Sequence, residues 1–197
     1  MKRRELLKMI AAATGTAFIG SHVLAYTVIP MKDSKDSGFS KDEVAFFNEV
    51  GESIIPRTDT PGAKDANVGS IMAVLLADCY SSAQRKTFKD GIESLKLKAK
   101  VSYAKEFLLL TSEQRLALLS SLDEEAIAQN RKTALDKTQN NDIEASQPHY
   151  FSMVKQLVLF SFFTSEVGAT KVLRYVATPG SYNGELPYKK GDKAWAT

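Results

Sequence analysis

Carboxylates are abundant in this chain, which has 23 Asp and Glu residues, and two of them could form the acid–base pair of a glycosidase-type hydrolase. Glu166 stands out because Ser165 precedes it. A Ser-Glu pair near a helix start, however, more often caps the helix and complements its dipole. His149 lies at an expected loop-to-helix junction, where no second histidine or cysteine is available to complete a dyad. We therefore expect structural roles for these three residues.

Cysteine and histidine are scarce, which restricts metal and redox sites. The chain has one cysteine, Cys79, and two histidines, His22 and His149. An intramolecular disulfide is excluded, a cysteine-ligated iron–sulfur cluster has no ligands, and a zinc site is disfavoured. Cys79 lies on an apolar helical stripe and is predicted to be a small buried hydrophobe. Because no Gly-rich phosphate loop of the dinucleotide or P-loop type is present, the chain offers no evident cofactor site.

The N-terminal residues have the pattern of an export signal. Arg3 and Arg4 precede an apolar run, and small side chains lie before Tyr26. The pattern resembles a twin-arginine signal, which exports folded proteins, usually with a cofactor already inserted. An uncleaved membrane anchor is the alternative, but the run is shorter than the roughly 20 residues that a spanning helix needs. The sequence predicts three parts, a signal peptide (1–25), a tether (26–39) and a domain (40–197).

Without this leader the charge is balanced. Residues 26–197 hold 22 basic and 22 acidic side chains, so neither nucleic acid nor an anionic membrane surface is an expected partner. These residues are enough for one domain with its own core. An export route used by cofactor-loaded proteins contrasts with a chain that has no evident cofactor site. We infer that the cofactor belongs to a partner protein.

Helix signals follow one another through the domain, starting with a capping box at 40–43. The first helix is expected to end before Pro56, and the second to start after Asn67. Ser82 is expected to cap a third helix, and a second capping box at 111–114 to open a fourth. Apolar residues recur every three or four positions, as in amphipathic helices. The expected inward residues of the fourth helix are Leu116, Leu119 and Leu122.

The last expected helix is the most apolar part of the domain. It should span 151–163, after an exposed loop at 138–147. Residues 157–163 are apolar around nearly the whole helix, so they need cover on more than one side, from the core, which we favour, or from a partner. The tail from Thr178 is rich in Pro and Gly and is expected to be irregular. Since no alternation of period two is evident, the sequence predicts an all-α domain of about five to seven helices.

The connection between the first two helices is expected to be an ordered loop. Pro56 stops the first helix, and Pro61-Gly62 suits the centre of a type II turn. Arg57 and Asp59 either pair with each other, which contributes little on a surface, or make charged contacts to a partner. The residues alone favour a purely structural role for this loop.

Three segments resemble a known family. The stretch Ile-Ile-Pro-Arg-Thr-Asp-Thr-Pro-Gly-Ala at 54–63, behind a twin-arginine leader, is similar to the first landmark of the gluconate 2-dehydrogenase subunit 3 family. Residues 162–168 resemble its second landmark, and Tyr175 with 179–182 resembles its closing segment. The resemblance covers almost the whole domain except 136–147, to which we assign no role.

This resemblance implies the small, gamma subunit of an exported dehydrogenase that acts on sugars or sugar acids. Such a subunit is non-catalytic, and its partner is a catalytic subunit of the glucose–methanol–choline type that holds FAD. A cytochrome c subunit often takes the electrons. The leader would carry the flavin-loaded partner through the twin-arginine translocase to the periplasm, where the complex can associate with the membrane. No catalytic, cofactor or metal residue is implied in this chain. The partner-interface candidates are Pro56, Arg57, Thr58, Asp59, Thr60, Pro61, Gly62, Phe162, Phe163, Ser165, Glu166, Gly168, Pro179 and Gly180.

Two other classes of function stay open. A free-standing exported enzyme would use a carboxylate acid–base pair. A periplasmic binding module would line a pocket with aromatic side chains, although core packing explains the aromatic residues more simply. The candidates for such a pocket are Tyr150, Phe151, Phe160, Phe162, Phe163 and Trp195.

Overall fold

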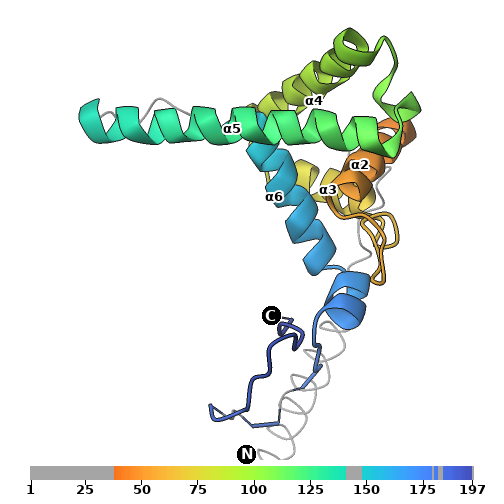
Figure 1. Cartoon of the computed structure of the whole chain (residues 1–197), viewed down its shortest axis with the longest axis vertical. Coiled ribbons are helices and arrows are strands. Elements are labelled where there is room, and N and C mark those ends of the chain that lie inside the picture. The colour runs from red at the N-terminus through yellow and green to blue at the C-terminus, as the bar shows by residue number, and fades with distance from the viewer. Residues whose placement is uncertain (1–37, 141–147, 179, 182–183, 197) are drawn as a thin grey trace, which may run out of the picture. The chain divides into compact units, whose positions relative to one another are not determined.

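The computed structural model describes residues 38–140, 148–178, 180–181 and 184–196, and this part of the chain is predominantly helical (Figure 1). It contains no strand, and one isolated parallel bridge joins Arg174 to Trp195. The predicted all-α class and helix number are confirmed for the described residues, whereas the predicted signal peptide lies outside them. The α-helices are α2 (Lys41–Ile54), α3 (Val68–Asp78), α4 (Ser82–Tyr103), α5 (Ser112–Asn140) and α6 (Tyr150–Phe163), with a 3-10 helix, η2 (Phe107–Leu109), and a π-helical turn, η3 (Gly168–Val172).

Capping boxes determine where three of these helices begin. The predicted capping boxes at 40–43 and 111–114 are both formed. The cap of α4 is Ser81 rather than the predicted Ser82. Ser81 Oγ accepts a hydrogen bond from the Gln84 amide (3.2 Å), and Gln84 Oε1 accepts one from the Ser81 amide (3.0 Å). Ser82 has Arg85 at the corresponding position, and a guanidinium has no acceptor to complete a capping box.

Helix α6 forms the centre of the core. It packs against α2, α3, α4 and α5 (Figure 1). Its inward side chains are buried. Helix α4 approaches it at Gly91, where an added Cβ would lie 2.8 Å from the Cβ of Tyr150. Full burial of each large apolar side chain stabilises the fold by about 1.5–3 kcal/mol. The inward side chains of α6 are Phe151, Val154, Leu157, Val158 and Phe162.

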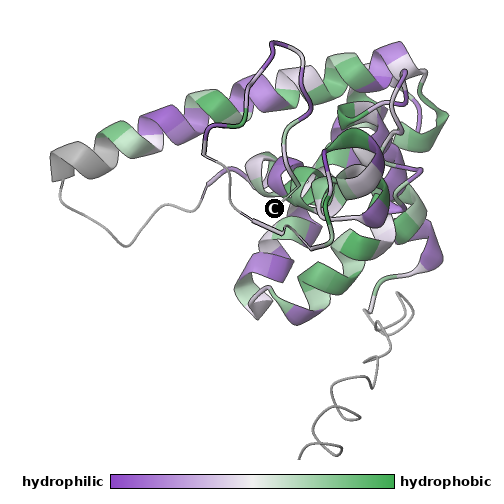
Figure 2. Ribbon diagram, turned by 90° about the horizontal axis from the view of Figure 1, so that it is seen from below, coloured by the Kyte–Doolittle hydropathy of each residue, from purple (hydrophilic) through white to green (hydrophobic). Residues whose placement is uncertain are grey.

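Helix α5 is longer than the sequence indicated. It continues to Asn140, so the predicted loop at 138–147 is wrong for its first three residues, and the rest lies outside the described part. Leu119 and Leu122 are buried as predicted, but Leu116 is 58% exposed. The part of α5 that extends past the other helices carries hydrophilic and hydrophobic residues in turn (Figure 2). Its Ala, Glu, Gln, Lys and Arg residues favour helix without requiring burial, which explains why a polar stretch is helical.

Cys79 does not lie in the core. It is the C-cap of α3 and is exposed, so the prediction of a buried thiol is wrong. The buried stripe of α3 ends at Leu76, because the helix ends at Asp78 and the backbone at Cys79 no longer keeps the stripe inward. No helix of the described residues combines the length and apolar character needed to cross a bilayer.

Candidate partner-binding site

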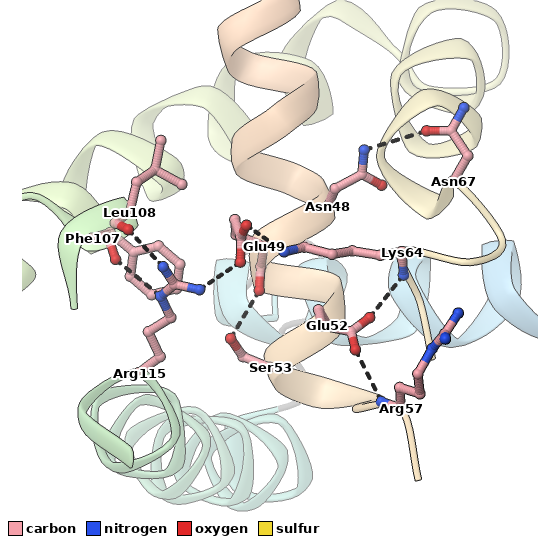
Figure 3. Close-up of polar contacts among 10 residues, drawn as sticks. All are labelled: Asn48, Glu49, Glu52, Ser53, Arg57, Lys64, Asn67, Phe107, Leu108 and Arg115. Carbon is pink, nitrogen blue, oxygen red and sulfur yellow. Dashed lines mark hydrogen bonds and ion pairs between the residues drawn. The ribbon is translucent and has the colours of Figure 1, made fainter. Parts of the chain in front are cut away.

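The loop that joins α2 to α3, here called the motif loop (residues 55–67), is hydrogen-bonded to Glu52 of α2. Glu52 Oε1 accepts a hydrogen bond from the Arg57 amide and its Oε2 one from the Lys64 amide, each at 2.9 Å (Figure 3). The Ala63 amide also donates to the carbonyl of Ile55 at 3.0 Å. One half-buried carboxylate thus holds both arms of the loop against the end of α2, and sequence reasoning missed it because Glu52 lies outside the motif.

Gly62 is required by close packing rather than by turn type. The predicted type II turn is wrong, since that turn needs a positive φ at Gly62 and none occurs there. Gly62 is buried, and an added Cβ would lie 2.6 Å from both the Arg57 amide nitrogen and Glu52 Oε1. The glycine therefore leaves room for the carboxylate that organises the loop.

Arg57 pairs within the loop, but not with Asp59 as one alternative predicted. Its guanidinium makes two hydrogen bonds to the Asp65 carboxylate, which also accepts one from the Gly62 amide (2.9 Å). The Arg57 hydrogen bond, followed by that from Gly62, holds the pKa of Asp65 below its ordinary value. Asp59 has no hydrogen-bond or ion-pair partner among the described residues, and it lies at an exposed tip. The exposed residues of the tip are Pro56, Arg57, Thr58, Asp59 and Thr60, with Pro61 half-buried.

A second polar cluster braces α2 against the start of α5. Arg115 is only 15% exposed and donates to Glu49, to the Phe107 carbonyl (3.2 Å) and to the Leu108 carbonyl (2.6 Å) (Figure 3). Glu49 also pairs with Lys64 of the motif loop. This cluster could not be predicted from local patterns, because Glu49 and Arg115 are 66 positions apart.

The second landmark segment, 162–168, is a tight turn at the end of α6. Ser165 Oγ donates to the Phe162 carbonyl (2.6 Å) and accepts from the Gly168 amide (3.0 Å). The structural role expected for Ser165 is confirmed, and Glu166 beside it is exposed. Phe162 and Gly168 are buried, so within this segment the candidates available to a partner are Phe163 and Glu166.

One face of α6 is apolar and uncovered. Leu159, Phe160 and Phe163 are exposed, with Phe160 at 57%. The favoured expectation that the core alone covers 157–163 is therefore wrong for these three residues, although Leu157, Val158 and Phe162 are buried. The spacing of apolar residues indicated that cover was needed on more than one side, but it gave no means of telling which side the core would cover.

The motif loop and the segment after α6 lie at the same end of the domain. Lys171 of η3 is close enough to Asp65 for its charge to lower the pKa of that carboxyl further. The structure thus brings the regions of the two landmarks together. The other two interface candidates, Pro179 and Gly180, are not placed beside these regions. Pro179 lies outside the described residues, and an added Cβ on Gly180 would meet nothing within 4 Å.

His149 caps α6, as its predicted helix-start position required. Its Nδ1 accepts a hydrogen bond from the Phe151 amide (3.3 Å), and its own amide donates to Asn130 (2.9 Å). Partial burial lowers the pKa of His149 from 6.5; the nearby Glu125 acts in the opposite direction, and Lys98, which pairs with Glu125, lowers it further. Only the neutral ring can accept at Nδ1, so the cap depends on deprotonation.

The pH dependence of this cap is testable. Because folded His149 has the lower pKa, the unfolded chain binds more protons below pH 6.5, and stability falls as the pH drops through that window. His149→Asn keeps a capping oxygen that does not titrate. Urea unfolding at pH 7.5 and pH 5.5 should show a smaller loss of stability in this variant than in the wild type. Equal losses would mean that His149 does not contribute.

The described residues offer few of the features that a small-molecule site needs. A cleft of about 520 Å³ is lined by Phe46, Phe107 and Leu108 together with the side chains of Ser40, Asp42, Glu43, Lys96 and Glu106. None of the aromatic candidates for a binding module lines this cleft. Phe162 is buried in the core, and Phe151, also buried, borders only a smaller hollow of about 140 Å³. No group of three or more His, Cys, Asp or Glu side chains within the described part is arranged to hold a metal ion.

The fold and this end of the domain define an all-α protein that presents an ordered loop and an uncovered apolar helix face, as an interaction subunit does. Residues 41–180 match the family model described as gluconate 2-dehydrogenase subunit 3, and this chain belongs to that family. It is therefore related to a subunit of a dehydrogenase complex, and the resemblance seen in the sequence is confirmed. Neither a curated protein nor a solved structure matches the chain.

Proposed function

We propose that this chain is the non-catalytic small subunit of an exported, FAD-dependent dehydrogenase of sugars or sugar acids. In this proposal its partner is a catalytic subunit of the glucose–methanol–choline type, and a cytochrome c subunit can complete the complex. The Arg3-Arg4 leader directs the assembled pair to the twin-arginine translocase and so to the periplasm. Because FAD stabilises only the folded catalytic chain, loading and folding precede export.

The observation that carries this proposal is the uncovered face of α6. Leu159 and Phe160, beside the second landmark, and Phe163, within it, are exposed in a chain whose family is named as a subunit. Aromatic side chains, Phe included, are enriched in protein interfaces relative to the rest of the surface. The motif loop is a second observation in favour of a partner contact. Its tip is exposed, and Asp59 there has no partner among the described residues.

The test is recovery of the flavoprotein with a tagged chain from the periplasm of the native host. Phe160→Ser should lower the flavin recovered per chain roughly ten-fold, since truncation of an interface anchor costs about 1.4 kcal/mol or more, which is ten-fold in affinity. Leu116→Ser is the matched control, because Leu116 is 58% exposed and Phe160 57%. Flavin absorbance, sugar-dependent dye reduction and circular dichroism are measured on each sample.

Three results would contradict the proposal in different ways. A wild-type chain recovered without a flavoprotein would contradict the role of small subunit, and sugar oxidation by that isolated chain would favour an enzyme. Recovery of the complex from the cytoplasm alone would contradict export. Equal losses from Phe160→Ser and Leu116→Ser would show that the α6 face is not the contact.

A further inference from the structure

The C-terminal arm, defined as the described residues of 173–196, is ordered but almost wholly exposed. Nearly every residue in it is exposed, so it contributes little to the core. Isolated apolar side chains are normal on a protein surface, whereas several of them gathered in one segment are typical of an interaction site. The exposed large side chains of the arm are Tyr175, Val176, Leu186, Tyr188 and Trp195.

Polar contacts hold the two ends of the arm together. The Arg174 amide donates to the Ala194 carbonyl (2.8 Å), and the Ala196 amide donates to the Arg174 carbonyl (3.0 Å). The Arg174 guanidinium lies over the Trp195 ring, 4.2 Å from its centroid. Lys193 Nζ reaches the Lys171 carbonyl (2.7 Å). The arm is thus closed on itself at Arg174 and Trp195 without the help of a core.

A tight turn fixes the most exposed part of the arm. The Asp192 amide donates to the Lys189 carbonyl (3.0 Å), and the Asp192 carboxylate accepts from the Lys189 amide (2.9 Å). Gly191 has φ +99, a conformation that this turn requires and that side chains rarely adopt. Tyr188, directly before the turn, is 78% exposed. An ordered surface of this kind loses little conformational entropy when it binds.

The charge of the arm differs from that of the remaining domain. The arm holds four basic and two acidic side chains, whereas residues 26–172 hold 18 basic and 20 acidic ones. Two such arms would repel each other, which disfavours a second copy of this chain as the occupant. An anionic bilayer would meet Glu185 and Asp192 as well as the lysines, and the described part of the arm contains no amphipathic helix, an element that typically lies in a membrane interface. A protein surface of complementary charge fits better.

We propose that the C-terminal arm docks on an apolar surface bordered by carboxylates on the flavin-bearing catalytic subunit. This inference rests on the proposed function and adds a second contact to the α6 face. Leu186 and Tyr188 supply the apolar contact, and Lys189 and Lys190 pair with the carboxylates. The motif loop contributes less to this contact, because most of its polar groups are hydrogen-bonded within the loop and to α2.

The experiment compares two double variants of the full chain in the complex with its flavoprotein. Leu186→Ala with Tyr188→Ala should weaken the complex roughly ten-fold or more, as expected when an aromatic anchor is removed. Leu97→Ala with Val101→Ala is the matched control, because both residues are exposed on α4 and Val101 has the same 78% exposure as Tyr188. The dissociation constant and the melting temperature are measured for each double variant. Neither double variant should change the melting temperature.

The outcomes separate this inference from the proposed function. If the wild-type chain binds the flavoprotein and the arm variant binds it equally well, the arm inference is overturned and the proposed function stands. If the wild type binds no flavoprotein, both are overturned. A third measurement tests binding of the chain to vesicles of phosphatidylglycerol and phosphatidylcholine. Binding to them that Lys189→Glu with Lys190→Glu abolishes would assign the arm to the membrane and overturn the inference; an absence of binding supports it.

Discussion

Replacing Gly168 with Ala is expected to destabilise the domain by about 3 kcal/mol, the upper part of the range for overpacked sites. An added Cβ would clash with the carbonyl oxygen of Phe162 and lie 2.8 Å from its carbonyl carbon. Both atoms belong to the backbone at the end of α6, so no side-chain rotation can relieve the contact. The turn would have to open, and the hydrogen bond from the Gly168 amide to Ser165 would be lost.

Urea unfolding followed by circular dichroism measures this effect. Gly180→Ala is the matched control, because an added Cβ there meets nothing within 4 Å and the backbone has no positive φ. Its free energy of unfolding should stay close to that of the wild type. If the two variants unfold at the same urea concentration, the turn after α6 tolerates a side chain, and the close approach of Gly168 to Phe162 is not what selects glycine.

The parts of the fold that could be predicted are those set by neighbours in the sequence. Capping boxes at 40–43 and 111–114 need only residues three positions apart, and both formed as expected. The stop before Pro56 follows from proline geometry. Even here, which serine caps α4 depended on the residue three positions later. Gln84, after Ser81, can accept a hydrogen bond, whereas Arg85, after Ser82, cannot. Local signals therefore located the starts of α2, α4 and α5 to within about a turn, but they did not show that α5 continues to Asn140.

The parts that could not be predicted depend on distant partners. Pro61-Gly62 is typical of a type II turn, but the carboxylate of Glu52 occupies the space beside Gly62 and gives the loop another conformation. Arg115 reaches Glu49 across 66 positions. The apolar run of α6 indicated a need for cover without showing that Phe160 would be left exposed. In each case the missing information was which elements pack together.

The structure gives Arg57, in the first landmark, a different pairing from the ones expected. Arg57 was expected either to pair with Asp59 or to reach a partner, yet it pairs with Asp65 inside the loop. Loss of its side chain should therefore act mainly on the order of the loop. Asp59, at the exposed tip, is the residue of this segment that is available for a charged contact. A comparison of Arg57→Ala with Asp59→Ala separates loop order from partner binding.

Glu52→Ala is expected to destabilise the domain by about 2 kcal/mol, because hydrogen bonds to a charged group contribute about 1.5–3 kcal/mol each and this carboxylate is only half-buried. The amides of Arg57 and Lys64 would both lose their acceptor. Glu124→Ala, at an exposed position on α5, removes the same charge and should leave stability nearly unchanged. Urea unfolding of the three proteins at pH 7.5 measures the difference.

A double-mutant cycle with Gly62→Ala tests the contact itself. In the wild-type background the added Cβ lies 2.6 Å and 2.7 Å from the two Glu52 oxygens, and 2.6 Å from the Arg57 amide nitrogen. Removing the carboxylate relieves the first two contacts, so the double variant should lose less stability than the two single losses added together. Strict additivity would mean that Glu52 does not occupy the space beside Gly62, and the loop would then need another explanation for its glycine.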